Sequence, residues 1–487
     1  CCRADTVGVF QIESRAQMAM LPRMRPRCFY DLVVEIALVR PGPIQGGMVH
    51  PYLRRREGTE AISYPNDQVR AVLQRTLGVP IFQEQAMRLA MVAGGFSADK
   101  AERLRRAMGA WKRRPDTMQQ IGAELVAGMQ ERGYRDDFID RCWKQIHGFS
   151  EYGFPESHSA SFALLVYASA WLKCHHPAAF ACSLLNSQPM GFYASAQIVR
   201  SAKEHGVEVR PIDINHSVIG CTLEPSAGPH RALRLGLRMV RGLSGDDASR
   251  ICAAVADLGQ VQDVWSLRER GVGAGALRAL ARADAFGSLS LDRQAALWEI
   301  KLVERGTLPL FPADTPWPER VRNGRGSGLP VIGPEQQVVQ DYRATGLSLK
   351  AHPVSFMRTW LDARGAVRAA QLKELEQLPR GHPTRRVAAG GLVLVRQQPH
   401  SAKGMVFMTI EDETGIVNIV MGPDVYQRCR AAVRHSPAVI AYGALQRRGE
   451  VVHLKAETIV AIGQPEGGAQ PSECTQWQVV GRGYSWR

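Results

Sequence analysis

Apolar residues in the first 215 positions recur every three or four residues, the spacing that places them on one face of an α-helix. Ser97 precedes Ala98 and Asp99 in the manner of a helix start, and proline and glycine mark turns between the helical stretches. Residues 1–215 are therefore predicted to form a mainly helical domain. The helical repeat is clearest at 86–93, 121–129 and 162–172.

Residues 216–300 contain two glycine-rich turns, each followed by a short apolar helix. The first turn holds Gly242 and Gly245, and the second holds Gly273. Glycine lets backbone N–H groups approach a phosphate at the start of a helix, which is how helix-hairpin-helix motifs bind DNA without reading its sequence. Ordinary helix turns would give the same pattern, so both interpretations stay open. Asp246 and Asp247, directly after the first turn, are interpreted as surface acids.

After residue 385 the periodicity changes from helix to strand. Short runs at 387–395, 406–411, 415–421, 438–445 and 451–456 predict five strands, with a helix at 423–434 between the third and the fourth. That order is typical of an OB-fold barrel, which commonly binds single-stranded nucleic acid on a basic and aromatic face. A barrel with only a structural role is the alternative. The candidate DNA-binding residues are Arg396, Lys403, Phe407, Arg447 and Arg448, with Tyr442 and Lys455 as further members of the face.

The segments around the barrel are less regular. Residues 301–384 are predicted to hold loops and a few helices, and residues 466–487 are predicted to be a tail with little regular structure. Leu308, Leu310 and Phe311 form an apolar stretch of the kind that docks in a partner's hydrophobic pocket, or else anchors the segment to the rest of the protein. The predicted fold is therefore multidomain: mainly α, with a tandem helix-hairpin-helix region, followed by a small β-barrel of the OB type.

Charge and composition narrow the class of partner. The 487 residues carry 61 Lys and Arg against 46 Asp and Glu, a formal net charge of +15, which favours a polyanion. No apolar run approaches the roughly 18 to 20 residues of a membrane-spanning helix, so nucleic acid is favoured over a membrane. Ten cysteines without paired spacing indicate reduced thiols and a cytoplasmic location. The chain begins with Cys1 and is expected to be the later part of a longer protein.

A basic cluster near residue 105 is the strongest candidate site. Arg105 and Arg106 stand side by side, and Lys112, Arg113 and Arg114 follow within roughly two helical turns. Guanidinium groups bind phosphate oxygens in pairs and stay charged at any working pH, so adjacent arginines can hold a nucleotide triphosphate. Solvated helix faces carry similar charge runs, and the cluster alone leaves both interpretations open.

Five motifs, taken together and in order, resemble the fingers region of bacterial C-family DNA polymerases, relatives of the replicative polymerase III alpha subunit. In that family a tandem helix-hairpin-helix, a clamp-contacting segment and an OB domain follow the fingers. The string at 154–158, Phe-Pro-Glu-Ser-His, stands where the replicative branch has Phe-Asn-Lys-Ser-His, and is most similar to the error-prone, damage-induced branch. The five motifs are VGVFQIES at 7–14, RPGP at 40–43, IFQEQ at 81–85, LRRAMG at 104–109, and YGF at 152–154 with SHS at 157–159.

The resemblance implies a function and a set of nucleotide-binding residues. The family adds dNTPs to a primer 3′ end on a DNA template by two-metal phosphoryl transfer, and the error-prone branch does so in translesion synthesis and damage-induced mutagenesis. Arg105 and Arg106 would hold the β- and γ-phosphates. Lys112 would supply, in a shifted register, the charge of a lysine pair that Ala110 and Trp111 replace. The other implied nucleotide-binding residues are Arg40, Gln83, Tyr152, His158 and Ser159.

The resemblance also implies parts that this sequence does not contain. Three palm aspartates bind Mg²⁺ in the family and are expected before Cys1, so no catalytic or metal-ligating residue is assigned and the chain alone is expected to be inactive. The implied partners are primer–template DNA, dNTP, a sliding clamp and mutasome proteins, although the apolar stretch at 307–311 lacks the leading glutamine of a clamp motif. A replicative polymerase III alpha subunit and a nucleic-acid-binding module without a polymerase role are the alternatives.

Overall fold

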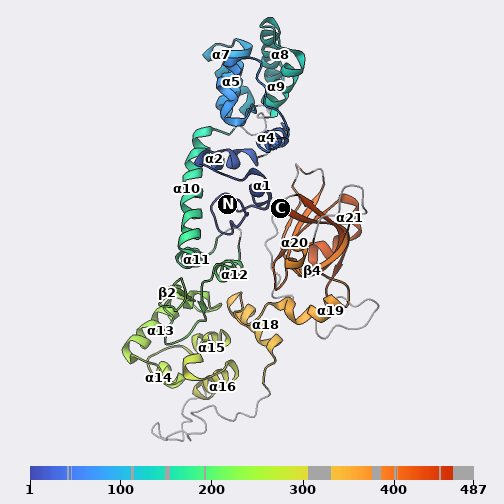
Figure 1. Ribbon diagram of the computed structural model, residues 1–487. Coiled ribbons are helices and arrows are strands. Elements are labelled where there is room, and N and C mark those ends of the chain that lie inside the picture. The colour runs from blue at the N-terminus through green and yellow to red at the C-terminus, as the bar shows by residue number, and fades with distance from the viewer. Residues whose placement is uncertain are drawn as a thin grey trace, which may run out of the picture. The chain divides into compact units, whose positions relative to one another are not determined.

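The computed structural model separates into two compact units (Figure 1). The first unit is Cys1–Trp171 with Arg448–Val451, and the second is Leu172–Arg447 with Val452–Arg487. No described helix is long and apolar enough to cross a membrane. The structure describes residues 1–40, 43–44, 46–110, 115–148, 154–190, 193–304, 331–375, 385–399, 402, 404–448 and 451–463.

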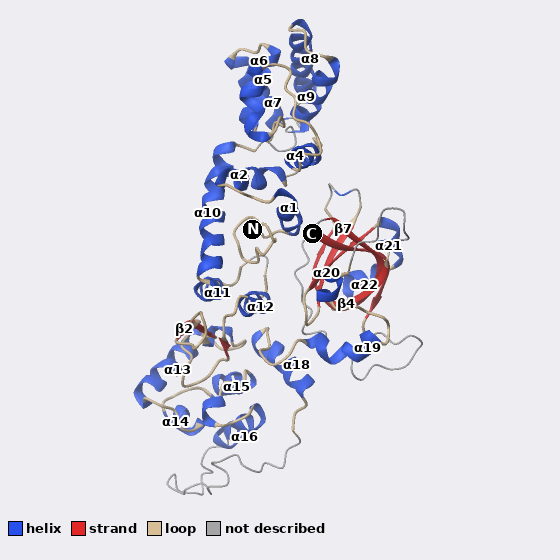
Figure 2. Ribbon diagram, viewed as in Figure 1, coloured by secondary structure: helices blue, strands red, loops and turns tan. Residues whose placement is uncertain are grey.

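Residues 1–171 fold into helices, as the apolar periodicity predicts (Figure 2). The three clearest stretches are confirmed as α6 (Gln83–Gly94), α8 (Pro115–Glu131) and α10 (Glu156–His175). Ser97 accepts a hydrogen bond from the Lys100 N–H at the start of α7 (Ala98–Ala110), which confirms the predicted helix start. The other elements are α1 (Arg15–Met24), α2 (Phe29–Leu38), α4 (Val49–Arg56), α5 (Asp67–Leu73), η1 (Gln74–Thr76) and α9 (Asp136–Gly148).

Two glycines let α6 and α8 cross closely. A Cβ atom on Gly128 would lie 2.2 Å from the Gly94 carbonyl oxygen, and a Cβ atom on Gly94 would lie 2.3 Å from the Leu125 side chain. Because atoms do not approach so closely, larger residues would push the two helices apart. Helix α7, which carries Arg105 and Arg106, packs against both of them.

One hydrophobic core runs through the helix-hairpin-helix region and beyond it. Its buried residues extend from α11 (Pro177–Asn186) to α16 (Arg293–Glu304) and include Leu347. A buried ion pair between Arg293 and Asp341 attaches α18 (Pro334–Thr345) to α16. We refer to α11 through α16 together with α18 as the hairpin body. Its other elements are α12 (Ser195–Glu204), β1 (Val209–Arg210), β2 (Thr222–Glu224), β3 (Ala232–Arg234), η2 (Leu237–Met239), α13 (Gly245–Leu258), α14 (Val264–Glu269), α15 (Ala274–Arg282) and η3 (Gly287–Leu289).

The five strands predicted after residue 385 close into a barrel of order β4-β5-β6-β8-β7. Strands β6 and β8 pair in parallel, and the predicted helix between the third and fourth strands is present as two short helices. A Cβ atom on Gly443 would lie 2.0 Å from the Lys455 carbonyl oxygen, so closure needs glycine there. The elements are β4 (Arg386–Gln397), β5 (Val406–Glu411), β6 (Ile416–Met421), α21 (Pro423–Arg428), α22 (Arg430–His435), β7 (Ala438–Arg448) and β8 (Val451–Ala461).

Three short helices between the hairpin body and β4 pack on the barrel. They are η4 (Pro353–Met357), α19 (Arg358–Asp362) and α20 (Ala369–Glu374). Leu372 of α20 is part of the barrel core, while Leu361 of α19 packs with residues of β4 and β7 in a second apolar cluster. These helices therefore belong to the barrel by their packing, although they precede its first strand.

Candidate nucleotide and nucleic-acid interfaces

The start of α6 and the start of α10 are joined through hydrogen bonds at Phe154 and Glu156. The Gln83 backbone N–H donates to the Phe154 carbonyl oxygen at 3.1 Å, and the Glu156 N–H donates to a Glu84 side-chain oxygen at 3.0 Å. Phe154 is buried. The two motifs lie far apart in the sequence and are therefore held together by backbone contacts in the first unit.

Ring contacts then link Arg40 and His158 to the same phenylalanine, Phe154. The Arg40 guanidinium carbon lies 4.6 Å from the centroid of the Phe154 ring, and the His158 ring lies 5.2 Å from the Phe154 ring. The Phe162 ring lies tilted at 4.1 Å from the His158 ring and meets the Phe10 ring edge-on at 5.3 Å. His158 is exposed. Three of the five sequence motifs thus converge on one cluster that presents a positive charge and an imidazole, which we call the Arg40–His158 cluster.

The other residues expected around the nucleotide are placed differently. Ser159 is completely buried, and its hydroxyl donates to the Val33 carbonyl oxygen at 2.5 Å. This hydroxyl fastens α10 to α2, so the expectation that it faces a nucleotide is corrected. Gln83 is half-buried at the first position of α6. Tyr152 and Lys112 lie outside the described residues.

Arg105 and Arg106 are exposed on α7 and share one carboxylate. Arg105 contacts Glu102 at 2.6 Å and Arg106 contacts it at 3.1 Å. The side-chain hydrogen bonds from Arg105 and Arg106 lower the pKa of Glu102 to about 2. Within the described part of the chain both guanidinium groups bond Glu102, and neither is joined to the Arg40–His158 cluster. Both remain accessible to an anion that can compete with Glu102.

Sequence patterns did not point to the apolar side of α10. Beyond His158 this helix exposes Leu164, Leu165, Tyr167, Trp171 and Leu172, each at 44–62%. The only signal in the sequence is the near absence of charge between Glu156 and Lys173. Exposed apolar residues at this density are typical of a contact surface.

The two predicted hairpins have the same geometry but different charge. Gly242 and Gly271 take left-handed backbone angles, with φ of 81° and 80°, at the two turns. Gly245 is the first residue of α13. In the first turn of this helix the Asp247 backbone N–H already donates a hydrogen bond to the Ser244 hydroxyl at 3.0 Å. Asp246 and Asp247 also place two acids in that first turn, and acids repel phosphate.

The second hairpin lacks these obstacles. Gly273 precedes α15, makes no side-chain cap, and is followed by a first turn without an acid. Arg278 and Arg282 lie further along the same helix and are exposed. Free N–H groups and positive charge are what a helix start needs to bind phosphate, so the second hairpin fits a phosphate better than the first.

Two arginines expected on the nucleic-acid face of the barrel instead form hydrogen bonds to backbone carbonyl oxygens of the protein. Arg396 donates from Nε to the Val433 carbonyl oxygen at 2.6 Å and also bonds the Ser436 carbonyl oxygen, and burial lowers its pKa. Arg447 donates to the Leu375 carbonyl oxygen at 3.2 Å. Both guanidinium groups fasten helices to the barrel, which corrects the prediction of a free basic face at these positions.

Two other residues expected on the nucleic-acid face, Phe407 and Lys455, are placed by the strand register. Val406, Met408 and Ile410 point into the barrel core, so Phe407 between them lies on the outer face. Phe407 pairs with Val420, and Val420 pairs with Lys455, which is exposed. An aromatic ring and a cation in one cross-strand row match the needs of a stacked base and its phosphate.

Several predicted residues cannot be placed. Lys403, Leu308, Leu310 and Phe311 lie outside the described residues, as does the side chain of Arg448. Within the described part of the chain, no group of three or more His, Cys, Asp or Glu side chains could hold a metal ion. The family resemblance places the Mg²⁺ ligands before Cys1, so none of the described residues is assigned to them.

Three stretches of the sequence match known families. Residues 1–133 match the bacterial DNA polymerase III alpha subunit finger domain, residues 206–296 the helix-hairpin-helix motif, and residues 387–462 the OB-fold nucleic acid binding domain. The predicted fold class, mainly helical with a helix-hairpin-helix followed by an OB barrel, is thereby confirmed.

Similar proteins are named error-prone DNA polymerases. The chain is 52% identical to error-prone DNA polymerase 2 of Rhizobium meliloti strain 1021 and 51% identical to error-prone DNA polymerase 1 of Agrobacterium fabrum, over 94% of its length in each case. It is 50% identical over 95% of its length to the error-prone DNA polymerase of Methylococcus capsulatus. The chain spans 42%, 42% and 44% of the length of these relatives. A solved asparaginyl-tRNA synthetase from Pyrococcus horikoshii is 23% identical over 20% of this chain and 23% of its own, with a TM-score of 0.16, which is too low to indicate a shared fold.

Proposed function

We propose that this chain, whose residues 1–133 match the bacterial DNA polymerase III alpha subunit finger domain and which also matches the helix-hairpin-helix motif and the OB-fold nucleic acid binding domain, binds nucleotide and DNA for an error-prone polymerase. That polymerase would add dNTPs to a primer 3′ end in translesion synthesis and damage-induced mutagenesis. The single observation that carries the proposal is the 52% identity to an error-prone DNA polymerase over 94% of the chain. Since the chain spans 42% of that relative, the activity of the whole enzyme is part of the proposal.

Arg105 and Arg106 are proposed to bind the β- and γ-phosphates of the incoming dNTP. Both are exposed and held next to each other by Glu102, and a triphosphate carries more charge than this one carboxylate. The Arg40–His158 cluster would line the same nucleotide pocket, with Gln83 at its edge. Its support is the convergence of three family motifs around the Phe154 ring, which contacts both the Arg40 guanidinium group and the exposed His158 ring.

DNA binding is assigned to two surfaces of the second unit. The second hairpin, at Gly273, would bind backbone phosphates of the primer–template, because its helix start is uncapped and free of acids. The outer row of the barrel, with Phe407 and Lys455, would bind single-stranded template by stacking and charge. Sliding-clamp and mutasome contacts remain proposals from the family resemblance.

The chemical step is not assigned to this chain. Transfer of the dNTP α-phosphoryl group to the primer hydroxyl requires Mg²⁺ ligands, and the described residues offer no group that fits them. What these residues would contribute is binding and orientation of the nucleotide and of the DNA, and we expect the chain by itself to be inactive in primer extension.

The test is a titration of fluorescent dNTP and of primer–template against the chain with Arg105→Ala and Arg106→Ala. Each lost charge-assisted hydrogen bond is worth about 1.5–3 kcal/mol, so nucleotide affinity should fall at least tenfold while DNA affinity changes less than twofold. Arg135→Ala is the matched control, since Arg135 is an arginine of the same unit with an 86% exposed side chain paired to Asp137. Equal loss of both affinities, or DNA binding without any nucleotide binding, would favour a nucleic-acid-binding module over a polymerase.

A further inference from the structure

The hairpin body and the barrel have separate hydrophobic cores within the second unit. Ile198, Val199 and Ala202 of α12 are buried in the core of the hairpin body, while the barrel is filled by a different set of residues from its strands and from α20. The two bodies meet where α18 contacts η4 and through polar groups at the turn between β5 and β6. We refer to residues 411–415 as the acidic turn, because it begins with Glu411, Asp412 and Glu413.

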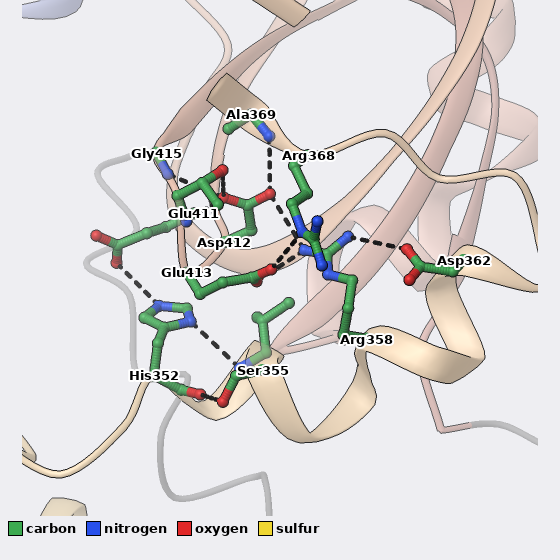
Figure 3. Close-up of polar contacts among 12 residues, drawn as sticks. His352, Ser355, Arg358, Asp362, Arg368, Ala369, Glu411, Asp412, Glu413 and Gly415 are labelled. Carbon is green, nitrogen blue, oxygen red and sulfur yellow. Dashed lines mark hydrogen bonds and ion pairs between the residues drawn. The ribbon is translucent and has the colours of Figure 1, made fainter. Parts of the chain in front are cut away.

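Asp412 and Glu413 fasten the short helices to the barrel (Figure 3). Asp412 is 1% exposed and accepts hydrogen bonds from the N–H groups of Thr414 and Gly415, at 2.7 and 2.9 Å, and of Ala369 at 2.8 Å. Arg358 of α19 lies 3.3 Å from Asp412 and 2.7 Å from Glu413. The acidic turn is thus rigidly built, and both carboxylates are used within the barrel and its helices.

Glu411 points the other way, toward the hairpin body. It is 7% exposed and pairs with Arg200 of α12, which also donates to the Asp412 carbonyl oxygen at 3.2 Å. His352, at the start of η4, lies 3.8 Å from the second Glu411 oxygen, and Figure 3 shows the His352 ring beside that carboxylate. Burial alone would raise the pKa of Glu411, but His352 and Arg200 hold it below its usual value.

Glu411 is buried in this pair, whereas the Arg200 side chain is 23% exposed. Removing the Glu411 charge from water costs several kcal/mol, which a well-placed partner only offsets, so such a pair specifies an arrangement more than it adds stability. Neighbouring domains otherwise move relative to each other by default. Arg200 and Glu411 lie 211 positions apart in the sequence and connect bodies whose apolar cores are distinct.

We propose that the Arg200–Glu411 pair is a latch that holds the hairpin body and the OB barrel in one fixed arrangement, so that both bind a single DNA molecule together. The ligand class is DNA that offers a duplex to the hairpins and a single strand to the barrel, such as a primer–template with a template overhang. This inference rests on the proposed function for its ligand, but the latch itself does not. When the two bodies are held in one arrangement, a DNA molecule bound to one of them meets the other at a high effective concentration. The complex with both bodies is therefore tighter than the complex with either one.

The variants that test the latch are Arg200→Ala and the shape-preserving Glu411→Gln. Arg210→Ala is the matched control, because Arg210 is also paired with two carboxylates, Glu208 and Glu224, but entirely within the hairpin body. Circular dichroism and melting of each variant report whether it folds. Hydrogen exchange of the backbone amides in the acidic turn tests the latch without any DNA. The exchange rate should increase at least tenfold in both latch variants and less than twofold in Arg210→Ala.

DNA affinities then separate the latch from the proposed function. For a primer–template with a long overhang, the latch variants should bind at least tenfold more weakly, with less than twofold change for the isolated duplex and the isolated single strand. Unchanged exchange at the acidic turn, unchanged affinity for the overhang substrate, or an equal loss on all three DNAs would overturn the latch. If the unmodified chain binds none of the three DNAs, the proposed function fails, and the exchange measurement still decides whether the pair holds the two bodies together.

Discussion

Glu35 of α2 in the first unit and Glu411 of β5 in the second unit are both buried carboxyl groups with opposite electrostatics. Glu35 is 0% exposed, and neither of its carboxylate oxygens has a hydrogen-bond partner among the described residues. Burial raises its pKa to about 8. Glu411 is 7% exposed and its pKa is lowered, because Arg200 and His352 outweigh the effect of burial. The partners, and not burial, decide whether a carboxyl group inside this protein is charged.

Arginine side chains also differ between sites in how far their guanidinium groups are paired within the protein. Arg54 and Arg55 both bind Glu60, and Arg56 binds Asp31 at 2.7 Å, so this run of three arginines is largely occupied in the structure. Among the described residues, Arg105 and Arg106 are paired with a single carboxylate on their own helix. A basic run therefore indicates a binding surface only where the fold leaves its guanidinium groups accessible.

The largest expected effect comes from removing a partner of Glu411. Arg200→Leu removes one of the two cationic partners of the buried Glu411 carboxylate and leaves His352, and breaking a buried pair typically costs about 3–5 kcal/mol. The pKa of Glu411 should rise, so the variant should lose less stability than the unmodified protein when acid protonates Glu411. Hydrogen exchange of the β5 amides between pH 4 and pH 8 measures both the loss of stability and the flatter pH dependence. Adding Glu411→Gln to Arg200→Leu should restore most of the stability, and a variant whose pH dependence keeps its original slope would contradict the comparison.

An effect of similar size, spread over a range of pH, is expected from removing the charge of Glu35. Its folded pKa of about 8 lies above the ordinary 4.5, so its stabilising contribution is fully present below pH 4.5 and is lost as the pH rises toward 8. Within that window the first unit should lose about 1.4 kcal/mol per pH unit from this group alone. Glu35→Gln should abolish that slope and stabilise α2 at pH 8, measured by hydrogen exchange of the α2 amides. Glu131→Gln, at an exposed position, is the control, and an undiminished slope in Glu35→Gln would show that another group titrates.

The smallest structural effect is expected at the exposed carboxylate of Glu102. Its pKa of about 2 reflects hydrogen bonds from Arg105 and Arg106 in solvent, and exposed pairs of this kind add little to stability. Glu102→Gln should leave the melting temperature unchanged within error and strengthen nucleotide binding a few-fold, because the two guanidinium groups lose a competitor. Titration with fluorescent dNTP measures the gain. Weaker nucleotide binding in this variant would mean that Glu102 orients the arginines more than it competes with the phosphates.

Much of this protein follows from local sequence alone. The 3.6-residue repeat predicts α6, α8 and α10, the alternating runs predict the strands of the barrel, and the glycine turns predict two hairpins, because each depends on residues close together in the chain. The ordered motifs indicated a resemblance to bacterial C-family DNA polymerases, and the match of residues 1–133 to the polymerase III alpha subunit finger domain agrees with it. Neither periodicity nor motifs predicted the small sheet of β1, β2 and β3, whose strands are two or three residues long.

Tertiary structure decided which of the candidate residues are available to bind a ligand. Arg396, Arg447 and Ser159 have the right chemistry for a binding face, but their polar groups bond backbone carbonyls contributed by other elements. Arg40, Phe154 and His158 come together only when α10 packs beside the turn after α2. The Arg200–Glu411 pair joins residues 211 positions apart. Sequence patterns report the chemistry of a side chain and its local backbone, whereas its partners are fixed by long-range packing, and those partners determine charge, accessibility and function.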